Sequence, residues 1–173
     1  MIQTYIATTR FNEDTLENNR RYKESRKIQG CIYGSGLCIN EKYPINSLMF
    51  VVEMNNSSNQ IEGIGLIRNS TKKDNYYNIY GPHSYNRYTY IGKYWASRAQ
   101  IIEKMPTIVR ILEIILFKGK SHLKRISGIS VITSKLIANW NKTKISNLDI
   151  IQKMNLRVQT AFYELFHIKM FMA

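Results

Sequence analysis

The stretch Ser47-Leu-Met-Phe-Val-Val-Glu-Met54, followed by Asn55-Asn-Ser-Ser-Asn59 and Gln60-Ile-Glu-Gly-Ile-Gly-Leu-Ile67, decides the fold. The first and third segments are apolar runs, and the second is a cluster of turn-forming residues. Apolar runs of this length bounded by Asn and Ser are typical of strands, so the stretch predicts a β-hairpin. Gly63 and Gly65 leave room for another backbone or a ligand to approach the second strand closely.

Segments on either side of the hairpin predict helices and further strands. Residues 4–8 and 126–133 are β-prone, and residues 87–95 alternate and are rich in aromatic side chains, so each segment predicts a strand. Residues 12–27 are polar and charged, which predicts a surface helix. Apolar residues recur at helical spacing from Pro106 to a plausible stop at Gly119, and Ser146-Asn-Leu-Asp149 resembles a capping box that opens a last helix.

These elements predict an α+β fold in which helices flank a mixed β-sheet or a small open barrel. We expect a domain over residues 1–144 and a C-terminal helix over residues 145–173. The apolar positions Ile151, Val158, Phe162 and Leu165 of that helix indicate that it packs on the core of this domain or binds a protein partner.

Charge is the outlying property of the composition. The 173 residues are 44% hydrophobic, which is enough for a core, but 25 Lys and Arg stand against 12 Asp and Glu, a net charge of +13 with a pI near 9.8. Such an excess favours a polyanionic partner, either nucleic acid or an anionic membrane surface, over an incidentally basic protein. The two cysteines exclude a disulfide scaffold and favour an intracellular, reducing compartment.

The hydropathy pattern predicts no membrane-spanning segment, and we expect no membrane partner. The longest apolar stretch, residues 108–117, is interrupted by Arg110 and Glu113 and is far shorter than the roughly 20 residues of a membrane span. The first residues lack the basic and apolar regions of a signal peptide. The abundance of Ile, Asn, Lys and Tyr is typical of an AT-rich genome, such as that of a large DNA virus or a protist.

The sequence contains only incomplete versions of enzyme motifs. Gly119-Lys-Ser121 imitates the end of a phosphate-binding loop, but Ile114 occupies the place of its first glycine, and Gly63-Ile-Gly65 lacks the third glycine of a dinucleotide fingerprint. The histidines and acidic residues show no metal or acid–base spacing, and Cys31 is more typical of a core residue than of a nucleophile. We therefore expect a non-enzymatic protein with no cofactor and no metal.

Aromatic residues are concentrated in one window. Seven of the twelve tyrosines fall within nineteen residues, directly before Trp95: Tyr76, Tyr77, Tyr80, Tyr85, Tyr88, Tyr90 and Tyr94. Cations bracket or interrupt this window: Arg68, Lys72, Lys73, Arg87, Lys93 and Arg98. Aromatic faces stack on unpaired bases, so this pattern favours a single-stranded nucleic-acid partner, and the alternative is that the rings pack the sheet.

Cations are concentrated in a second segment. No acidic residue lies between Glu113 and Asp149, whereas seven basic residues do: Lys118, Lys120, Lys124, Arg125, Lys135, Lys142 and Lys144. Residues 118–125, hereafter the basic loop, mix these cations with Gly, Ser and His, a composition that suits phosphate contact as well as a solvated charge run. We expect phosphate contacts from Lys118, Lys120, Ser121, His122, Lys124 and Arg125.

The order of short motifs in the first hundred residues resembles a known family. The motifs are Gly30-Cys-Ile-Tyr33-Gly-Ser35, Leu48-Met-Phe-Val-Val52, Asn56-Ser-Ser58 and Ile61-Glu-Gly-Ile-Gly65. They resemble the YTH domain, a PUA-like fold, related to EVE domains, that reads N6-methyladenosine in RNA. The resemblance implies a base pocket in which Tyr33 takes the place of a Trp wall, and Tyr80, Tyr85 or Trp95 supplies a second wall.

In that pocket, polar groups near Ser35 and Asn40 are the candidates for reading the edge of the base. An aromatic box discriminates a methylated base because burial of the methyl group is favourable, and it requires an unstacked base. The sequence thus favours a module that binds single-stranded RNA. The alternative is a viral packaging or chromatin-like protein that binds nucleic acid without selecting bases.

Overall fold

The computed structural model describes residues 3–82, 84–141 and 145–168. Strands and helices follow one another in this order: β1 (Thr4–Phe11), α1 (Glu13–Ser25), β2 (Cys31–Ser35), β3 (Leu48–Asn55), β4 (Gln60–Arg68), the short 3-10 helix η1 (Ser84–Asn86), β5 (Tyr88–Gly92), β6 (Tyr94–Ser97), α2 (Arg98–Lys104), α3 (Pro106–Phe117), β7 (Ser130–Val131), α4 (Ser134–Ala138) and α5 (Asn147–Phe166).

The strands form two sheets. Five of them lie in the order β6-β4-β3-β1-β7, in which β1 and β3 are parallel and the other pairs are antiparallel. The other sheet is the antiparallel pair of β2 and β5. The fold is therefore α+β, as predicted, with a mixed sheet, and the strands of the described residues do not close into a barrel.

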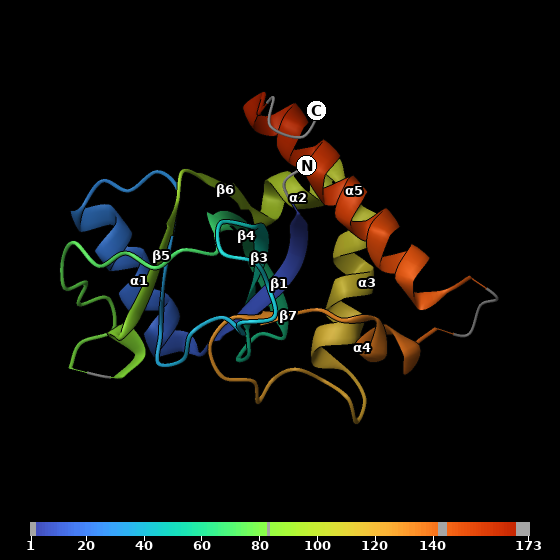
Figure 1. The fold of residues 1–173 in the computed structure, drawn as a ribbon, viewed down its shortest axis with the longest axis horizontal. Helices are drawn as coiled ribbons and strands as arrows, with labels where there is room; N and C mark the ends of the chain where they lie inside the picture. Colours follow the sequence, from blue (N-terminus) through green and yellow to red (C-terminus); the bar gives the residue numbers. More distant parts are fainter. Residues whose placement is uncertain (1–2, 83, 142–144, 169–173) are drawn as a thin grey trace.

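The large sheet is buried on both faces, which explains the unbroken apolar run of β3. Alternate side chains of a strand point to opposite faces. Leu48, Phe50 and Val52 belong to a core shared with α2, α3 and α5, whereas Met49 and Val51 belong to a second core shared with β2, β5 and α1. Figure 1 shows these layers, with α3 and α5 on one side of the sheet and α1, β2 and β5 on the other.

The C-terminal helix packs on the first core. Ser146 is its N-cap, since the Ser146 side chain accepts a hydrogen bond from the backbone N–H of Asp149 at 3.1 Å; this is one half of the predicted capping box. Val158 and Phe162 are fully buried, and the Phe162 ring meets that of Phe50 edge-on at 5.0 Å between centroids. The apolar face of α5 thus serves the core of the domain.

Two predicted strands differ from the structure. The segment predicted as one strand over residues 87–95 forms β5 and β6, which belong to different sheets. The chain changes sheets after Gly92, where a Cβ atom would overlap the backbone carbonyl of Leu66. The strand predicted over residues 126–133 is limited to Ser130–Val131, which pairs with the middle of β1. Helix α2 was not predicted.

Close approach at Gly65 packs the two sheets against each other, and close approach at Gly63 packs β4 against β6 within the large sheet. A Cβ atom on Gly65 would clash with the Tyr33 hydroxyl and the Cys31 side chain of β2. A Cβ atom on Gly63 would lie 2.8 Å from the indole nitrogen of Trp95 and 2.7 Å from the carbonyl oxygen of Ala96. The close approach predicted at these glycines is therefore made by side chains and backbone of this same chain.

We expect Gly65→Ala to lower the free energy of unfolding by about 1–3 kcal/mol, because the added methyl group overpacks the space between the sheets. Urea denaturation of the variant and the wild type measures this difference. Gly36→Ala is the matched control, since the nearest atom to its Cβ would be 3.5 Å away. Equal midpoints for all three proteins would show that the sheets are not pressed together here.

Candidate functional site

A cavity of about 350 Å³, hereafter the cap pocket, lies where β1 and β2 end and α1 begins. Four separate segments of the chain converge on it. The described residues that line it are Thr9, Arg10, Phe11, Asn12, Thr15, Gly34, Ser35, Gly36, Leu37, Tyr80, Ser84, Tyr85, Ser127 and Gly128.

A capping box forms the α1 wall of the cap pocket. The Asn12 side chain accepts a hydrogen bond from the Thr15 backbone N–H at 2.8 Å, and the Thr15 hydroxyl accepts one from the Asn12 backbone N–H at 3.0 Å. On the β2 wall, the Ser35 hydroxyl donates to the Leu37 carbonyl at 2.6 Å and accepts from the Leu37 N–H at 3.1 Å. These polar side chains fix the local backbone, so the walls are preorganised.

Tyr80 and Tyr85 supply the aromatic surface of the cap pocket. Tyr80 is buried, and its hydroxyl accepts a hydrogen bond at 3.2 Å from the side chain of Asn19 on α1. Tyr85 is 50% exposed and leaves part of its ring open to solvent. The pocket thus combines one buried tyrosine ring with one half-exposed ring.

Asn86 holds the segment that carries both tyrosines. Its side-chain oxygen accepts hydrogen bonds from the backbone N–H groups of Ile79 and Tyr80 at 3.0 and 3.1 Å, and its amide donates to the Gly81 carbonyl at 2.6 Å. Asn86 is itself buried. Asn86 was not predicted from the sequence, although an Asn side chain in a turn-rich segment commonly forms hydrogen bonds with nearby backbone groups.

The charge of the cap pocket is positive. Arg10 is the one charged side chain among the described residues that line it, and the guanidinium group donates to the carbonyl of Ile126. Ile126 follows the basic loop directly, and the next two residues, Ser127 and Gly128, line the pocket. The basic loop therefore leads to the rim of the cap pocket.

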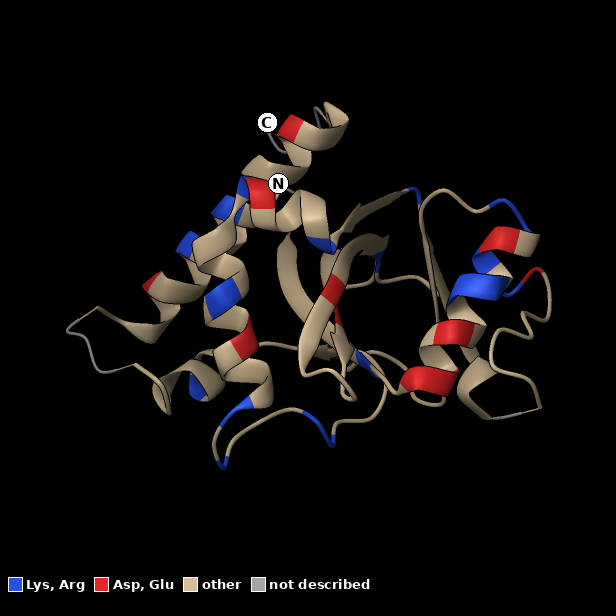
Figure 2. Cartoon of the chain, turned by 180° about the vertical axis from the view of Figure 1, so that it is seen from behind, with Lys and Arg blue, Asp and Glu red and all other residues tan. Residues whose placement is uncertain are grey.

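The basic loop is attached to the β3–β4 turn and to α3 by hydrogen bonds to its own backbone, which leave most of its cations outside. The Asn56 side chain donates to the Lys124 carbonyl at 2.8 Å, and the Leu123 N–H donates to the Leu116 carbonyl at 2.8 Å. Lys118, Lys120 and Arg125 are exposed. Figure 2 shows Lys and Arg along this loop at the lower edge of the molecule, whereas α1 carries both signs.

Two polar residues of the basic loop are engaged within the chain. The Ser121 hydroxyl accepts a hydrogen bond from the Asn139 side chain at 3.0 Å, and His122 Nδ1 accepts one from the Lys124 N–H at 3.3 Å. They shape the loop, so its cations are the better candidates for phosphate contact. Lys142 and Lys144 of the longer basic segment lie outside the described residues.

The structure brings together three of the six predicted base-pocket residues. Ser35, Tyr80 and Tyr85 line the cap pocket, whereas Tyr33, Asn40 and Trp95 do not. The Tyr33 ring has 0% exposure because it fills the space over Gly65 between the two sheets, so neither of its faces is open to a base. The Asn40 side chain accepts a hydrogen bond from the Lys42 N–H within an exposed loop.

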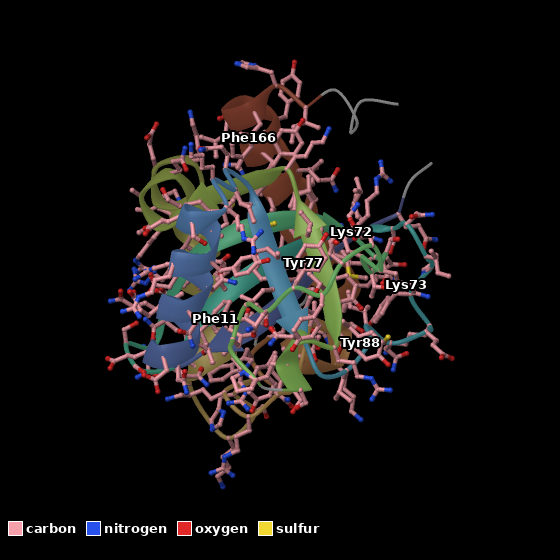
Figure 3. The ribbon with its side chains drawn as sticks, turned by 90° about the vertical axis from the view of Figure 1, so that its left-hand side faces the viewer. Phe11, Lys72, Lys73, Tyr77, Tyr88 and Phe166 are labelled. Atoms are coloured by element: carbon pink, nitrogen blue, oxygen red, sulfur yellow. The ribbon has the colours of Figure 1, made fainter. Side chains whose placement is uncertain are left out.

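The cations that bracket the tyrosine window lie away from the cap pocket. Lys72 pairs with Thr89 of β5 through a backbone hydrogen bond of 2.8 Å. In Figure 3, Lys72, Lys73 and Tyr88 lie on one side of β2 and Phe11 on the other, with Tyr77 between them. The interleaving of cations and tyrosines in the sequence therefore does not become one continuous surface.

A second cavity, hereafter the Glu53 pocket, has a volume of about 630 Å³ and lies between α1 and the edge of the large sheet. The described residues that line it are Leu16, Asn19, Arg20, Lys23, Glu24, Lys27, Ile28, Gln29, Glu53, Glu62 and Trp95. Trp95 thus belongs to this cavity. Glu53 was not predicted to be a site residue, although it is the single charged residue in the apolar run of β3.

Glu53 is a buried carboxyl group held by two donors. Its Oε1 atom accepts hydrogen bonds from the Tyr33 hydroxyl at 2.7 Å and the Trp95 indole N–H at 2.9 Å. Burial raises the pKa of Glu53 above its ordinary value of 4.5, and the hydrogen bond from Tyr33 opposes this rise. Burial also raises the pKa of the adjacent Cys31 thiol to about 12, which fits the interpretation of Cys31 as a core residue.

Comparisons with protein-family models, curated proteins and solved structures found no match for this chain. No helix within the described residues is long and apolar enough to span a membrane. In the same part of the chain, no three His, Cys, Asp or Glu side chains form a group that could hold a metal ion. The two cavities and the basic loop are therefore the features from which we infer the function.

We expect Glu53→Gln to change how stability depends on pH. Because the folded state raises the pKa of this carboxyl, the stability it contributes is complete below about pH 4.5 and is lost as the pH rises through the folded-state value. The glutamine variant cannot lose a proton there, so its melting temperature should gain on the wild type as the pH rises. Thermal melts from pH 4 to 8 measure the difference.

The exposed Glu41→Gln is the control for this experiment and should follow the wild type across the range. A constant difference in melting temperature between Glu53→Gln and the wild type would mean that Glu53 has the same pKa in the folded and unfolded chains.

Proposed function

We propose that this protein is a non-enzymatic module that binds single-stranded RNA, with one unstacked base in the cap pocket and the phosphate backbone on the basic loop. The observation that carries the proposal is the position of the cap pocket, which joins an aromatic wall to the end of the basic loop. Neither cavity nor loop alone is specific for nucleic acid, but their junction suits a nucleotide.

The aromatic wall supports base binding. A base inserted beside Tyr85 would cover a ring that is half exposed in the free protein, and Phe11 and Tyr80 would form apolar surface behind it. Stacking of a base on an aromatic side chain contributes about 1–3 kcal/mol and requires an unpaired base. Single-stranded RNA presents such bases.

The charge around the cap pocket supports phosphate binding. The described residues that line it include no Asp or Glu, so a phosphate near Arg10 would meet no opposing carboxylate in the wall. The basic loop adds Lys118, Lys120, Lys124 and Arg125 along the chain that leads to the pocket. A bound strand would therefore follow this loop and turn one base into the cavity.

The same pocket suits a modified base such as N6-methyladenosine, the ligand that the resemblance to YTH domains implies. β2, which carries the first of the resembling motifs, ends at the cap pocket. With Tyr33 buried, the box around a methyl group would consist of Phe11, Tyr80 and Tyr85. Burial of one methyl group contributes about 0.8 kcal/mol, which corresponds to about a fourfold preference.

We expect Tyr85→Ala to weaken binding of a short single-stranded RNA by about 5- to 150-fold, because the stacked ring is removed. Fluorescence anisotropy with labelled oligonucleotides, with and without a central N6-methyladenosine, measures both the affinity and the preference. Tyr76→Ala is the matched control, since Tyr76 belongs to the same segment, is 72% exposed and does not line the cap pocket. Equal effects of the two substitutions would contradict a base in the cap pocket.

We expect the double variant Lys124→Gln/Arg125→Gln to lower the salt dependence of binding. Each lost phosphate contact reduces the slope of log K against log salt by about 0.7 for a single strand, so the slope should fall by about 1.4. The control is Lys153→Gln/Arg157→Gln, which removes one Lys and one Arg from the exposed side of α5. A slope that falls equally in both double variants would indicate a diffuse basic surface.

The alternative is a packaging protein that binds nucleic acid without selecting bases. The net charge of +13 favours it, although Lys and Arg on α3 and α5 are accompanied there by Asp and Glu. Its signature would be equal affinity for single and double strands, no effect of Tyr85→Ala, and a uniform loss of binding with salt.

A further inference from the structure

The Glu53 pocket has a built-in hydrogen-bond acceptor that its own chain does not fully use. Glu53 is 4% exposed, and both hydrogen bonds to it go to Oε1, from Tyr33 and Trp95. Within the described residues, no hydrogen bond reaches the other oxygen, Oε2. A carboxylate oxygen accepts two hydrogen bonds, so the pocket offers a second acceptor oxygen, whose direction the two donors on Oε1 fix.

A flat ring and a cation lie beside this acceptor. The Lys23 ammonium lies over the Trp95 ring at 4.0 Å from its centroid, and both residues line the cavity. Burial lowers the pKa of Lys23 below its ordinary value of 10.5, while Glu53 raises it, so the ammonium is desolvated within reach of the carboxylate's field. The pocket therefore places an acceptor, a donor and an aromatic surface around one space.

We propose that the Glu53 pocket is a second binding site and that its ligand is a guanine base, supplied by a free guanine nucleotide or by a guanine of single-stranded RNA. The edge of guanine carries two adjacent N–H donors, N1–H and the 2-amino group, next to the O6 acceptor. Glu53 Oε2 would accept from the donors, Lys23 would donate to O6, and Trp95 would border the ring.

The other bases fit this arrangement less well. Adenine has an unprotonated ring nitrogen beside its amino group, so its lone pair would face the carboxylate. Uracil has one N–H between two carbonyl oxygens, which the carboxylate repels. Cytosine has an amino group but no neighbouring ring N–H. Guanine alone pairs two donors with the carboxylate and an acceptor with the ammonium.

The Glu53 pocket has cations for the phosphate of a nucleotide, although Glu24 and Glu62 also line this cavity. Arg20 and Lys27 line it and are exposed. Arg20 is already paired with Glu62 at 2.9 Å, so Lys27 is the cation that a phosphate would engage first. The free-nucleotide form of this proposal is independent of the proposed function, and only its RNA form rests on it.

Titration calorimetry of the full chain with GMP, AMP, CMP and UMP tests the proposal. We expect GMP to bind at least about tenfold more tightly than the other three, since guanine alone gives hydrogen bonds to both charged groups. IMP, which lacks the 2-amino group, should fall between GMP and AMP. Glu53→Gln and Lys23→Met should each remove the preference, and melting temperatures confirm that both variants are folded.

Tyr85→Ala separates the two sites, because Tyr85 lies in the cap pocket and its loss should leave the preference for GMP over AMP unchanged. A second titration compares single-stranded RNAs that carry one guanine or one adenine, and a guanine preference seen there but not with GMP assigns the site to RNA. Failure of the cap pocket would appear as no effect of Tyr85→Ala on RNA binding, with the GMP preference intact. The proposal is overturned if neither nucleotides nor RNAs show a guanine preference, or if folded Glu53→Gln keeps it.

Discussion

The hydrogen bonds on Oε1 of Glu53 hold the two sheets in their relative positions. Tyr33 comes from β2 of the small sheet, Glu53 from β3 at the centre of the large sheet, and Trp95 from β6 at its edge. A buried carboxyl without partners would be strongly unfavourable, so the chain gains from keeping both donors in place. Because β2 is thereby fixed against β3, the end of β2 reaches the cap pocket and α1 is left to cover the Glu53 pocket.

The two cavities share a wall on α1. Asn19 lines the Glu53 pocket, and its amide donates to the Ile32 carbonyl and to the hydroxyl of Tyr80, which lines the cap pocket. The buried amide of Asn19, which lines the Glu53 pocket, therefore positions Tyr80, which lines the cap pocket. The arrangement depends on the burial of Asn19, which is 4% exposed, because the neighbouring residues keep its short side chain in place.

Local patterns were sufficient to predict the hairpin, the first and last helices and the α+β class, because each depends on residues adjacent in the chain. The division of residues 87–95 between two sheets could not be predicted in this way, since it depends on the contact of Gly92 with Leu66. The burial of Tyr33 is a similar case, because it requires the space over Gly65. Tyr80 and Tyr85 became candidates through the resemblance to YTH domains and the tyrosine-rich window, whereas Asn86 and Glu53 became visible only through their partners in space.

The parallel pairing of β1 with β3 links ligand binding to folding. The paired residues are separated by 44 positions, as with Thr8 and Val52, so the pairing is a long-range contact that closes a loop containing α1 and β2. The same event brings the end of β1 and the start of α1 to the cap pocket. A chain in which these strands are unpaired thus has no complete cavity, and any ligand of the cap pocket stabilises the native state alone, by an amount that grows with the logarithm of the ligand concentration.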